Sequence, residues 1–122
     1  MEEQNEALRK FQKELNSGTA SLVLLRVLSQ ADSPMYGYQI AKLIENRTRD
    51  VPMMKQGALY PVLRSLESGG LLESEVEPSV SGPPRRYYRI TGYGREILAQ
   101  WTEVWHQTRE FVDAILKGGD DD

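Results

Sequence analysis

The chain has 122 residues and a net charge of −3, and 39% of its residues are hydrophobic, so we expect one globular domain with a modest core. It contains no cysteine and one histidine, which rules out disulfides and thiolate metal sites and argues against a histidine-based metal centre or triad. No apolar run approaches the roughly 18 residues of a membrane span, and the Met1-Glu2-Glu3 start does not resemble a signal peptide. We therefore expect a cytoplasmic protein without a cofactor or a membrane partner.

The charges are distributed unevenly, which matters because phosphate binding depends on the local field of one face. The net negative charge argues mildly against nucleic acid as a partner. However, basic residues outnumber acids between residues 36 and 66, and residues 85–95 hold four arginines without an acid. The acids gather near both ends of the chain. A basic DNA-binding face is therefore compatible with the composition.

Residues 4–15 have the periodicity of a short amphipathic helix, with Leu8 and Phe11 in its apolar stripe. We expect Asn16-Ser17-Gly18 to end this helix. Such a helix is too short to be stable alone, and two docking sites are open: the body of its own domain or a second subunit.

Two further helices are expected before residue 50. The first ends near Gln30 and is apolar nearly all round, which predicts that it is buried. The second begins at Tyr36, with Gln39 and Lys42 directed outward, and it ends before Pro52.

The stretch from Lys55 to Ser68 places Leu59, Leu63 and Leu66 on one side at helical spacing. Gly69-Gly70 is expected to end this helix, because glycine adopts the left-handed conformation of a helix C-cap. Pro61 lies inside the pattern, so the helix either begins shortly before it or is kinked there. The residues off the apolar stripe are Lys55, Gln56, Tyr60 and Arg64, and they form a polar, basic side that fits a DNA groove.

After Gly70 the period changes to two, which predicts a hairpin of residues 72–77 and 85–90 with a long loop. Its charged face would set Glu73, Glu75 and Glu77 opposite Arg85, Tyr87 and Arg89. These arginines either pair with the acids or contact DNA, and both interpretations stay open for Arg89. Arg85 and Arg86 border the exposed tip, where DNA contact is favoured.

Thr91 is expected to cap a last helix that runs to about Lys117. Its apolar residues alternate in steps of three and four, which is a heptad seam, and further apolar residues widen the face. A domain of this size does not readily cover so wide a face, so a symmetric dimer is the simplest explanation. The expected interface residues are Leu8, Phe11, Leu98, Trp101, Trp105, Val112 and Ile115. Residues 118–122 would form a disordered acidic tail.

The sequence contains three motifs whose order and spacing together are specific. They lie within Met35–Ile40, Gly57–Leu72 and Arg85–Gly94. In these motifs the chain resembles the PadR family of bacterial transcriptional regulators. The resemblance implies a mainly α fold with a small β-hairpin, namely a winged helix-turn-helix followed by a long dimerisation helix, as in the short branch of that family. A proline is common in the family at the position of Pro61, which removes the conflict there.

The corresponding division of the chain has four parts. These are an N-terminal helix at residues 1–16 that contacts either the body or the partner, the winged helix-turn-helix at 17–90, the dimerisation helix at 91–117 and the tail at 118–122.

The resemblance also implies a homodimer that binds an inverted-repeat operator and usually represses transcription. The residues that would contact bases in the major groove are Lys55, Gln56 and Arg64. Those that would contact phosphate or a narrow minor groove are Gln39, Lys42, Tyr60, Arg85 and Arg86. For Tyr60 the alternative is a ring packed in the domain, and for Gln39 and Lys42 it is a merely solvated face.

Trp101 and Trp105 have two interpretations. Both can fill the dimer core as seam residues, but a multidrug-sensing relative stacks flat aromatic ligands on a tryptophan that matches Trp105. In the second interpretation a small planar aromatic effector binds at Trp105 and Trp101; both interpretations stay open for Trp105, whereas the dimer core is favoured for Trp101.

The leading function is a ligand-responsive DNA-binding repressor. The alternative is a winged-helix module for protein–protein assembly without specific DNA binding, which the net negative charge favours slightly. The sequence has no activated nucleophile, metal cluster or phosphate-cradling glycine loop, so we do not expect an enzyme.

Overall fold

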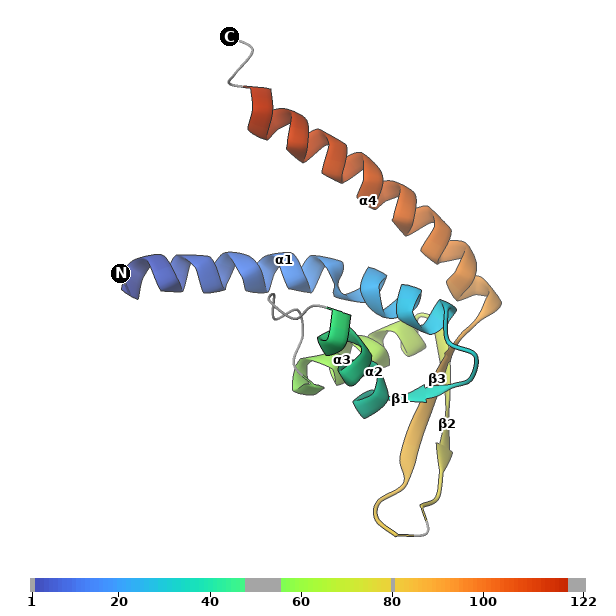
Figure 1. Cartoon of the computed structure of the whole chain (residues 1–122). Helices are drawn as coiled ribbons and strands as arrows, with labels where there is room; N and C mark the ends of the chain where they lie inside the picture. Colours follow the sequence, from blue (N-terminus) through green and yellow to red (C-terminus); the bar gives the residue numbers. More distant parts are fainter. Residues whose placement is uncertain (1, 48–55, 80, 119–122) are drawn as a thin grey trace.

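The computed structural model describes residues 2–47, 56–79 and 81–118, which form four helices and three strands. In chain order these are α1 (Glu2–Ser29), β1 (Met35–Tyr36), α2 (Gly37–Arg47), α3 (Gln56–Ser68), β2 (Leu72–Glu77), β3 (Arg85–Ile90) and α4 (Gly92–Gly118). Figure 1 shows the hairpin extending beside α2 and α3, while α1 and α4 reach away from it. The predicted mainly helical fold with a hairpin wing and a long last helix is confirmed. Among the described residues, no helix is long and apolar enough to span a membrane.

The sheet is antiparallel, with the strand order β1-β3-β2. Its hairpin has the predicted register, in which the pairs on the charged face are Glu73–Arg89, Glu75–Tyr87 and Glu77–Arg85. Strand β1 is missing from the prediction, because two residues are too few to display a period of two. Since Tyr36 pairs with Tyr87 in this strand, α2 begins at Gly37 and the predicted helix start at Tyr36 is wrong.

Helix α1 is continuous from Glu2 to Ser29, so the predicted end at Asn16-Ser17-Gly18 is wrong. Side chains bond within the helix around this point: Gln12 Nε2 donates to Asn16 Oδ1 at 2.9 Å, and Thr19 Oγ1 donates to the Leu15 carbonyl at 3.0 Å. One glycine inside a helix costs only about 1 kcal/mol relative to alanine. The turn residues at 16–18 therefore do not interrupt a helix that is stabilised on both sides.

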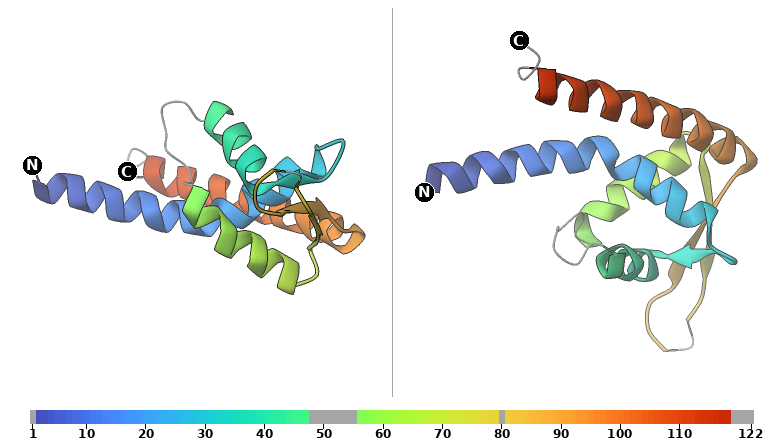
Figure 2. Two further views of the ribbon diagram at one scale, coloured as in Figure 1. Left: turned by 90° about the horizontal axis from the view of Figure 1, so that it is seen from below. Right: turned by 45° about the horizontal axis from the view of Figure 1, so that its top comes forward.

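The core lies where the C-terminal half of α1 packs against α2, α3 and the base of the sheet (Figure 2). Its fully buried side chains are Leu24, Leu25, Ile40, Leu59, Leu63 and Leu72. Burying each such side chain stabilises the fold by about 1.5–3 kcal/mol relative to leaving it exposed. The apolar stripe of α3 is therefore buried as predicted, and this determines which side of α3 faces solvent.

The hairpin joins α4 through a close contact between Leu71 and Gly94. Gly70, with a φ of 81°, has the left-handed conformation that turns the chain from α3 into Leu71. Thr91 caps α4 as predicted, because its Oγ1 accepts a hydrogen bond from the Gly94 N–H at 2.9 Å. A Cβ atom at Gly94 would collide with the carbonyl oxygen of Leu71. This position therefore requires glycine.

We predict that Gly94→Ala lowers the free energy of unfolding by about 3 kcal/mol, because the added methyl group forces α4 away from Leu71. Gly92→Ala is the matched control, since a Cβ there meets nothing within 4 Å, and it should stay within about 1 kcal/mol of the wild type. Urea unfolding followed by circular dichroism compares the variants. An equal loss of stability in both would contradict the contact at Gly94.

Candidate nucleic-acid interface

The side of α3 opposite its buried leucines carries small and polar residues. The exposed positions in α3 are Gly57, Ala58, Pro61, Arg64, Ser65 and Ser68, which recur at helical spacing. Small side chains allow another surface to approach the helix closely, while Arg64 reaches beyond them. The sequence prediction identified Arg64 but missed Ser65, although its position one residue further along the exposed side makes it accessible.

The two other predicted base contacts are Gln56 and Lys55. Gln56 is the first residue of the helix, and Lys55 lies outside the described residues. Pro61 lies within α3 and leaves the carbonyl of Gly57 without its usual helical partner, which is one hydrogen bond near the beginning of the helix. The proline therefore does not prevent α3 from continuing to Ser68.

Tyr60 packs between α3 and α2. Its ring lies so close to Gly37 that a Cβ there would be 2.6 Å from Tyr60 Cε1 and 2.7 Å from the hydroxyl oxygen. The side chain is half-buried and packs against the hydrophobic core. Of the two interpretations of Tyr60, the packed ring is therefore confirmed, and a bond from its hydroxyl to phosphate stays a prediction.

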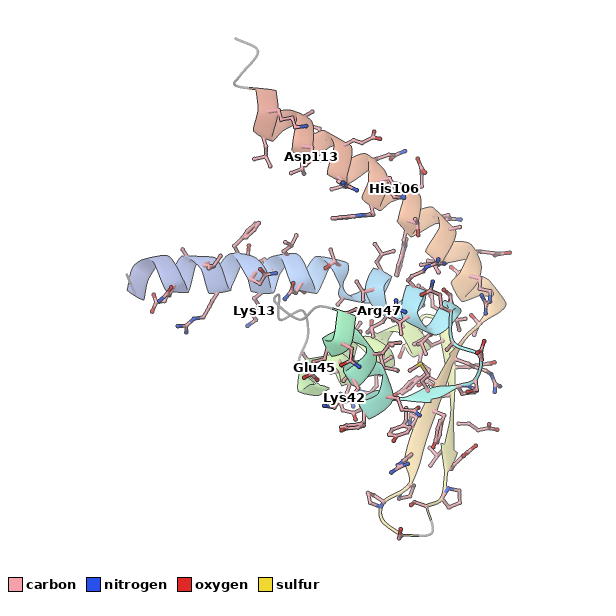
Figure 3. All side chains as sticks on the ribbon, in the orientation of Figure 1. Lys13, Lys42, Glu45, Arg47, His106 and Asp113 are labelled. Carbon is pink, nitrogen blue, oxygen red and sulfur yellow. The ribbon has the colours of Figure 1, made fainter. Side chains whose placement is uncertain are left out.

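The two candidates on α2, Gln39 and Lys42, are exposed but have contacts within the chain. Gln39 Oε1 accepts a hydrogen bond from the Tyr36 N–H at 3.1 Å, as in one half of a capping box. Lys42 Nζ lies 3.7 Å from a Glu45 carboxylate oxygen and 5.7 Å from the centre of the Tyr38 ring (Figure 3). The exposed Lys42–Glu45 pair contributes little to stability, so Lys42 can exchange it for phosphate. Gln39 can donate to phosphate from Nε2 while its Oε1 keeps the bond to Tyr36.

The wing, formed by β2 and β3, has an outer face made up of Glu73, Glu75, Glu77, Arg85, Tyr87 and Arg89. Arg89 Nε donates to Glu73 Oε1 at 2.6 Å, and this hydrogen bond and the carboxylate charge raise the pKa of the guanidinium. The charge-pairing interpretation is thus confirmed for Arg89. The Arg85 guanidinium lies 4.5 Å from the centre of the Tyr36 ring, a cation–π contact.

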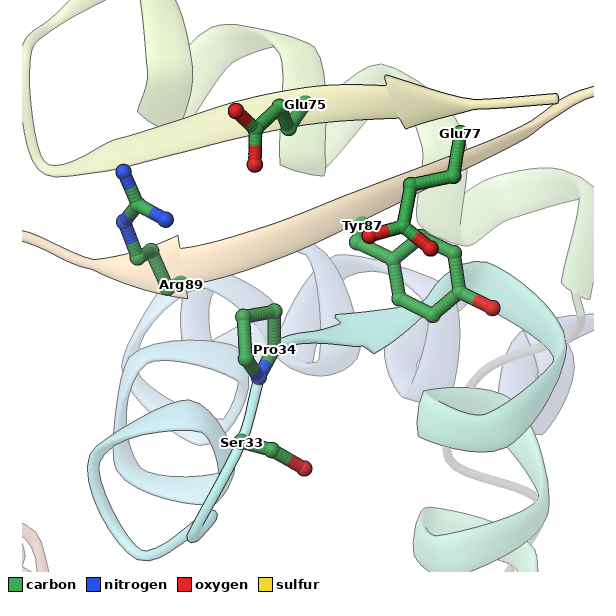
Figure 4. Close-up of a pocket in the computed structure, with 6 residues that line it drawn as sticks. All are labelled: Ser33, Pro34, Glu75, Glu77, Tyr87 and Arg89. Carbon is green, nitrogen blue, oxygen red and sulfur yellow. The ribbon is translucent and has the colours of Figure 1, made fainter.

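An open pocket of about 240 Å³ lies on the outer face of the wing (Figure 4). Its lining residues are Ser33, Pro34, Glu75, Glu77, Tyr87 and Arg89. Glu75 and Glu77 bring two carboxylates to this pocket, and its arginine is already bonded to Glu73. Phosphate would be repelled at this pocket, whereas Arg85, near the tip of the same face, is not among the lining residues.

The inner face of the wing, made up of Leu72, Ser74, Val76, Arg86, Tyr88 and Ile90, contains no acid. Arg86 is exposed and its Nη1 donates to Ser74 Oγ at 2.9 Å, while the Ser74 hydroxyl donates to Glu67 Oε2 at 2.6 Å. Burial raises the pKa of the Tyr88 hydroxyl; Glu67 adds to the rise, and Arg86 and Arg64 oppose it. Both arginines therefore lie near one buried tyrosine, where α3 meets the wing.

Apolar side chains are exposed on the distal halves of α1 and α4, which extend beyond the core (Figure 1). Those among the predicted interface residues are Leu8, Phe11, Trp105, Val112 and Ile115, and Phe111 and Leu116 are exposed as well. Leu98 differs from this set: it is only 7% exposed, because the first turns of α4 pack into the core of their own chain. Trp101 is half-buried against the same core.

These elements define the class of protein. Helices α2 and α3 with the β2–β3 hairpin form a winged helix-turn-helix, in which the second helix of the pair presents its exposed side for recognition. The described residues contain no group of three histidine, aspartate or glutamate side chains suited to a metal ion.

Residues 24–100 match the family model described as the transcriptional regulator PadR-like family. The chain therefore belongs to the PadR-like family of transcriptional regulators, and it is a DNA-binding regulator rather than an enzyme. The resemblance found in the sequence is thus confirmed. Family membership decides against an assembly module that does not bind DNA.

Relatives cover nearly the whole chain. It is 36% identical over 112 residues to the transcriptional regulator Rv3488 of Mycobacterium tuberculosis, an alignment that spans 91% of this chain and 92% of that protein. A PadR family regulator from Eggerthella lenta has a crystal structure that superposes with a TM-score of 0.78 at 33% identity, covering 96% and 98% of the two chains. The crystal structure of a PadR-like regulator from Bacillus cereus superposes with a TM-score of 0.68 at 26% identity, covering 85% of this chain and 97% of that one. The chain thus has the short form of the family, with one long C-terminal helix.

Proposed function

We propose that this protein is a cytoplasmic repressor that binds an inverted-repeat operator as a homodimer, with α3 in the major groove. The observation that carries this proposal is the exposed side of α3, where small residues and Arg64 lie opposite fully buried leucines. Such a helix can enter a groove about 12 Å wide without exposing apolar side chains. The wing then lies beside the groove with Arg86 toward the DNA.

The candidate contacts fall into two groups in this arrangement. Lys55, Gln56 and Arg64 contact bases, since an amide fits adenine and a cationic side chain fits guanine. The residues that contact phosphate or an adjacent groove are Gln39, Lys42, Tyr60, Arg85 and Arg86.

The test of this function is binding of the purified protein to the DNA upstream of its own gene at two salt concentrations. Saturable binding that weakens with salt and survives excess unrelated DNA is the expected result, because phosphate contacts release counterions. Where that DNA is not bound, selection from a random duplex library extends the search to other operators. Failure of every duplex to bind would overturn the proposal.

Arg64→Ala and Gln56→Ala should each weaken specific binding about 5- to 150-fold and relax sequence preference, as expected for lost base contacts. Arg85→Ala should weaken binding to all duplexes to a similar extent. Arg89→Ala is the control, because its guanidinium is bonded directly to the Glu73 carboxylate. Fluorescence anisotropy with specific and random duplexes measures all four variants, and wild-type affinity in Arg64→Ala and Gln56→Ala would refute the assignment of α3.

We propose that residues 91–117 pair with their counterpart and that residues 1–16 contact the partner subunit, leaving residues 17–90 as the DNA-binding part. The support is the exposed apolar surface on both long helices, which includes Phe11 at 60% and Ile115 at 64% exposure. A two-fold dimer covers both surfaces at once and matches an inverted repeat.

Sedimentation equilibrium at micromolar concentration should therefore show a dimer. Val112→Asp should weaken dimerisation by about 100-fold or more, because two-fold symmetry places two unpaired carboxylates in the interface. Gln107→Asp, at an exposed polar position of the same helix, should leave it unchanged. A wild-type monomer at this concentration would contradict the proposed interface.

We further propose that a small planar aromatic compound binds between the subunits on Trp105 and releases the DNA. Trp105 supports this because it retains 37% exposure, whereas Trp101, which would lie beside the ligand, is already half-buried. Planar aromatic compounds, phenolic acids among them, should quench tryptophan fluorescence and lower DNA affinity in the wild type. Trp105→Ala should lose both effects, and Trp101→Phe should keep the release of DNA. Undiminished release from Trp105→Ala would contradict this site.

A further inference from the structure

Glu67 occupies a position where two effects oppose a carboxylate. It lies in the last turn of α3, where the partial negative charge of the helix end disfavours an acid. It also lies near Arg64 and Arg86, where it lowers the positive field that attracts phosphate. Since Glu67 is half-buried, a hydrogen-bond partner offsets the partial loss of water around its carboxylate. Its contact with the wing supplies a reason for an acid at this place.

The hydrogen bonds from Arg86 through Ser74 to Glu67 have one direction. A serine hydroxyl has a single hydrogen, and that of Ser74 is directed at Glu67 Oε2 over 2.6 Å, a length typical of an O–H donor to a carboxylate. The Ser74 oxygen therefore accepts from Arg86 Nη1, 2.9 Å away. These two hydrogen bonds link the end of α3 to the wing through side chains alone.

The hydrogen bond to Ser74 orients Arg86 and leaves it able to bind a further acceptor. A guanidinium has five N–H donors, and Ser74 engages one, so several remain for an acceptor outside the protein. An arginine that is already oriented loses less rotamer freedom when it binds a ligand. The other wing arginines differ, because Arg89 is bonded directly to a carboxylate and Arg85 lies on the Tyr36 ring.

We propose that Ser74 and Glu67 are positioning residues of the DNA interface, which hold the Arg86 guanidinium toward the DNA backbone while the neighbouring α3 presents Arg64 to the bases. This inference rests on the proposed function, since it takes Arg86 as a phosphate contact. The environment of Tyr88 supports it, because Glu67, Arg64 and Arg86 all act on that one buried hydroxyl.

The test is a double-mutant cycle in the full chain, measured as binding to a random-sequence duplex at several salt concentrations. Arg86→Ala should reduce the slope of log affinity against log salt by about 0.9, the value for one phosphate contact. Ser74→Ala should weaken binding about 3- to 10-fold, and it should have no further effect once Arg86 is alanine. Ser74→Thr keeps the hydroxyl and should bind DNA as tightly as the wild type.

Two substitutions at Glu67 separate positioning from charge. Glu67→Gln removes the charge but keeps an oxygen that accepts from Ser74, so it should bind DNA at least as tightly as the wild type. Glu67→Ala removes the acceptor too and should bind more weakly than Glu67→Gln. If Glu67 only repelled phosphate, both variants would bind more tightly and equally, which would overturn the proposal.

The outcomes separate this inference from the function on which it rests. An Arg86→Ala variant with wild-type affinity and salt slope would remove Arg86 from the proposed interface. Suppose instead that Arg86→Ala binds DNA more weakly, but that Ser74→Ala has no effect or one simply additive to that of Arg86→Ala. This result would keep Arg86 in the proposed interface and overturn the positioning role of Ser74. Thermal unfolding of each variant identifies the temperatures at which all are folded. Should Ser74→Ala not fold, the comparison of Glu67→Gln with Glu67→Ala still decides.

Discussion

The burial of the α3 leucines determines how every candidate DNA contact on that helix is presented. A helix of 13 residues is not stable alone, and α3 is held because Leu59 and Leu63 belong to one core cluster with Leu24 and Ile40. Successive residues on a helix are about 100° apart, so a rotation by one residue would expose a leucine and turn Arg64 toward the core. The core, rather than DNA, therefore sets the direction in which Arg64 points.

Strand alternation explains how a chain with a net charge of −3 can offer a basic surface to DNA. Because neighbouring residues of β2 and β3 point to opposite faces, the acids Glu75 and Glu77 fall on the outer face, whereas Arg86 falls on the inner face. The outer face neutralises much of its own charge through the bond between Arg89 and Glu73. The local charge around each proposed contact therefore decides how DNA is attracted, and the net charge of the whole chain is a poor guide.

Local periodicity was enough to predict the buried side of α3, the hairpin register and the cap at Thr91, because each depends on residues close in sequence. It did not predict features that depend on distant contacts. The choice between a packed and an exposed ring stayed open for Tyr60, and Leu98 was expected at the dimer interface, because spacing within one helix does not reveal how the helices pack. The continuous α1 shows the related limit, since the weak stop at Gly18 is overcome by the helix on either side.

The first turns of α4 pack into the core while its distal part is exposed, and this division indicates how the proposed effector would act on DNA binding. The first turns are fixed to the body, since Gly94 lies against Leu71 and Arg95 Nη1 donates to the Ser29 carbonyl at 3.4 Å. The distal part carries the exposed apolar residues and Trp105, to which we assign the partner and the ligand. Because Leu71 follows α3 after only two glycines, a change in the angle between the two α4 helices of the proposed dimer moves each α3 with it. A ligand at Trp105 can therefore alter operator affinity without touching DNA, provided that it favours one spacing of the two recognition helices over another.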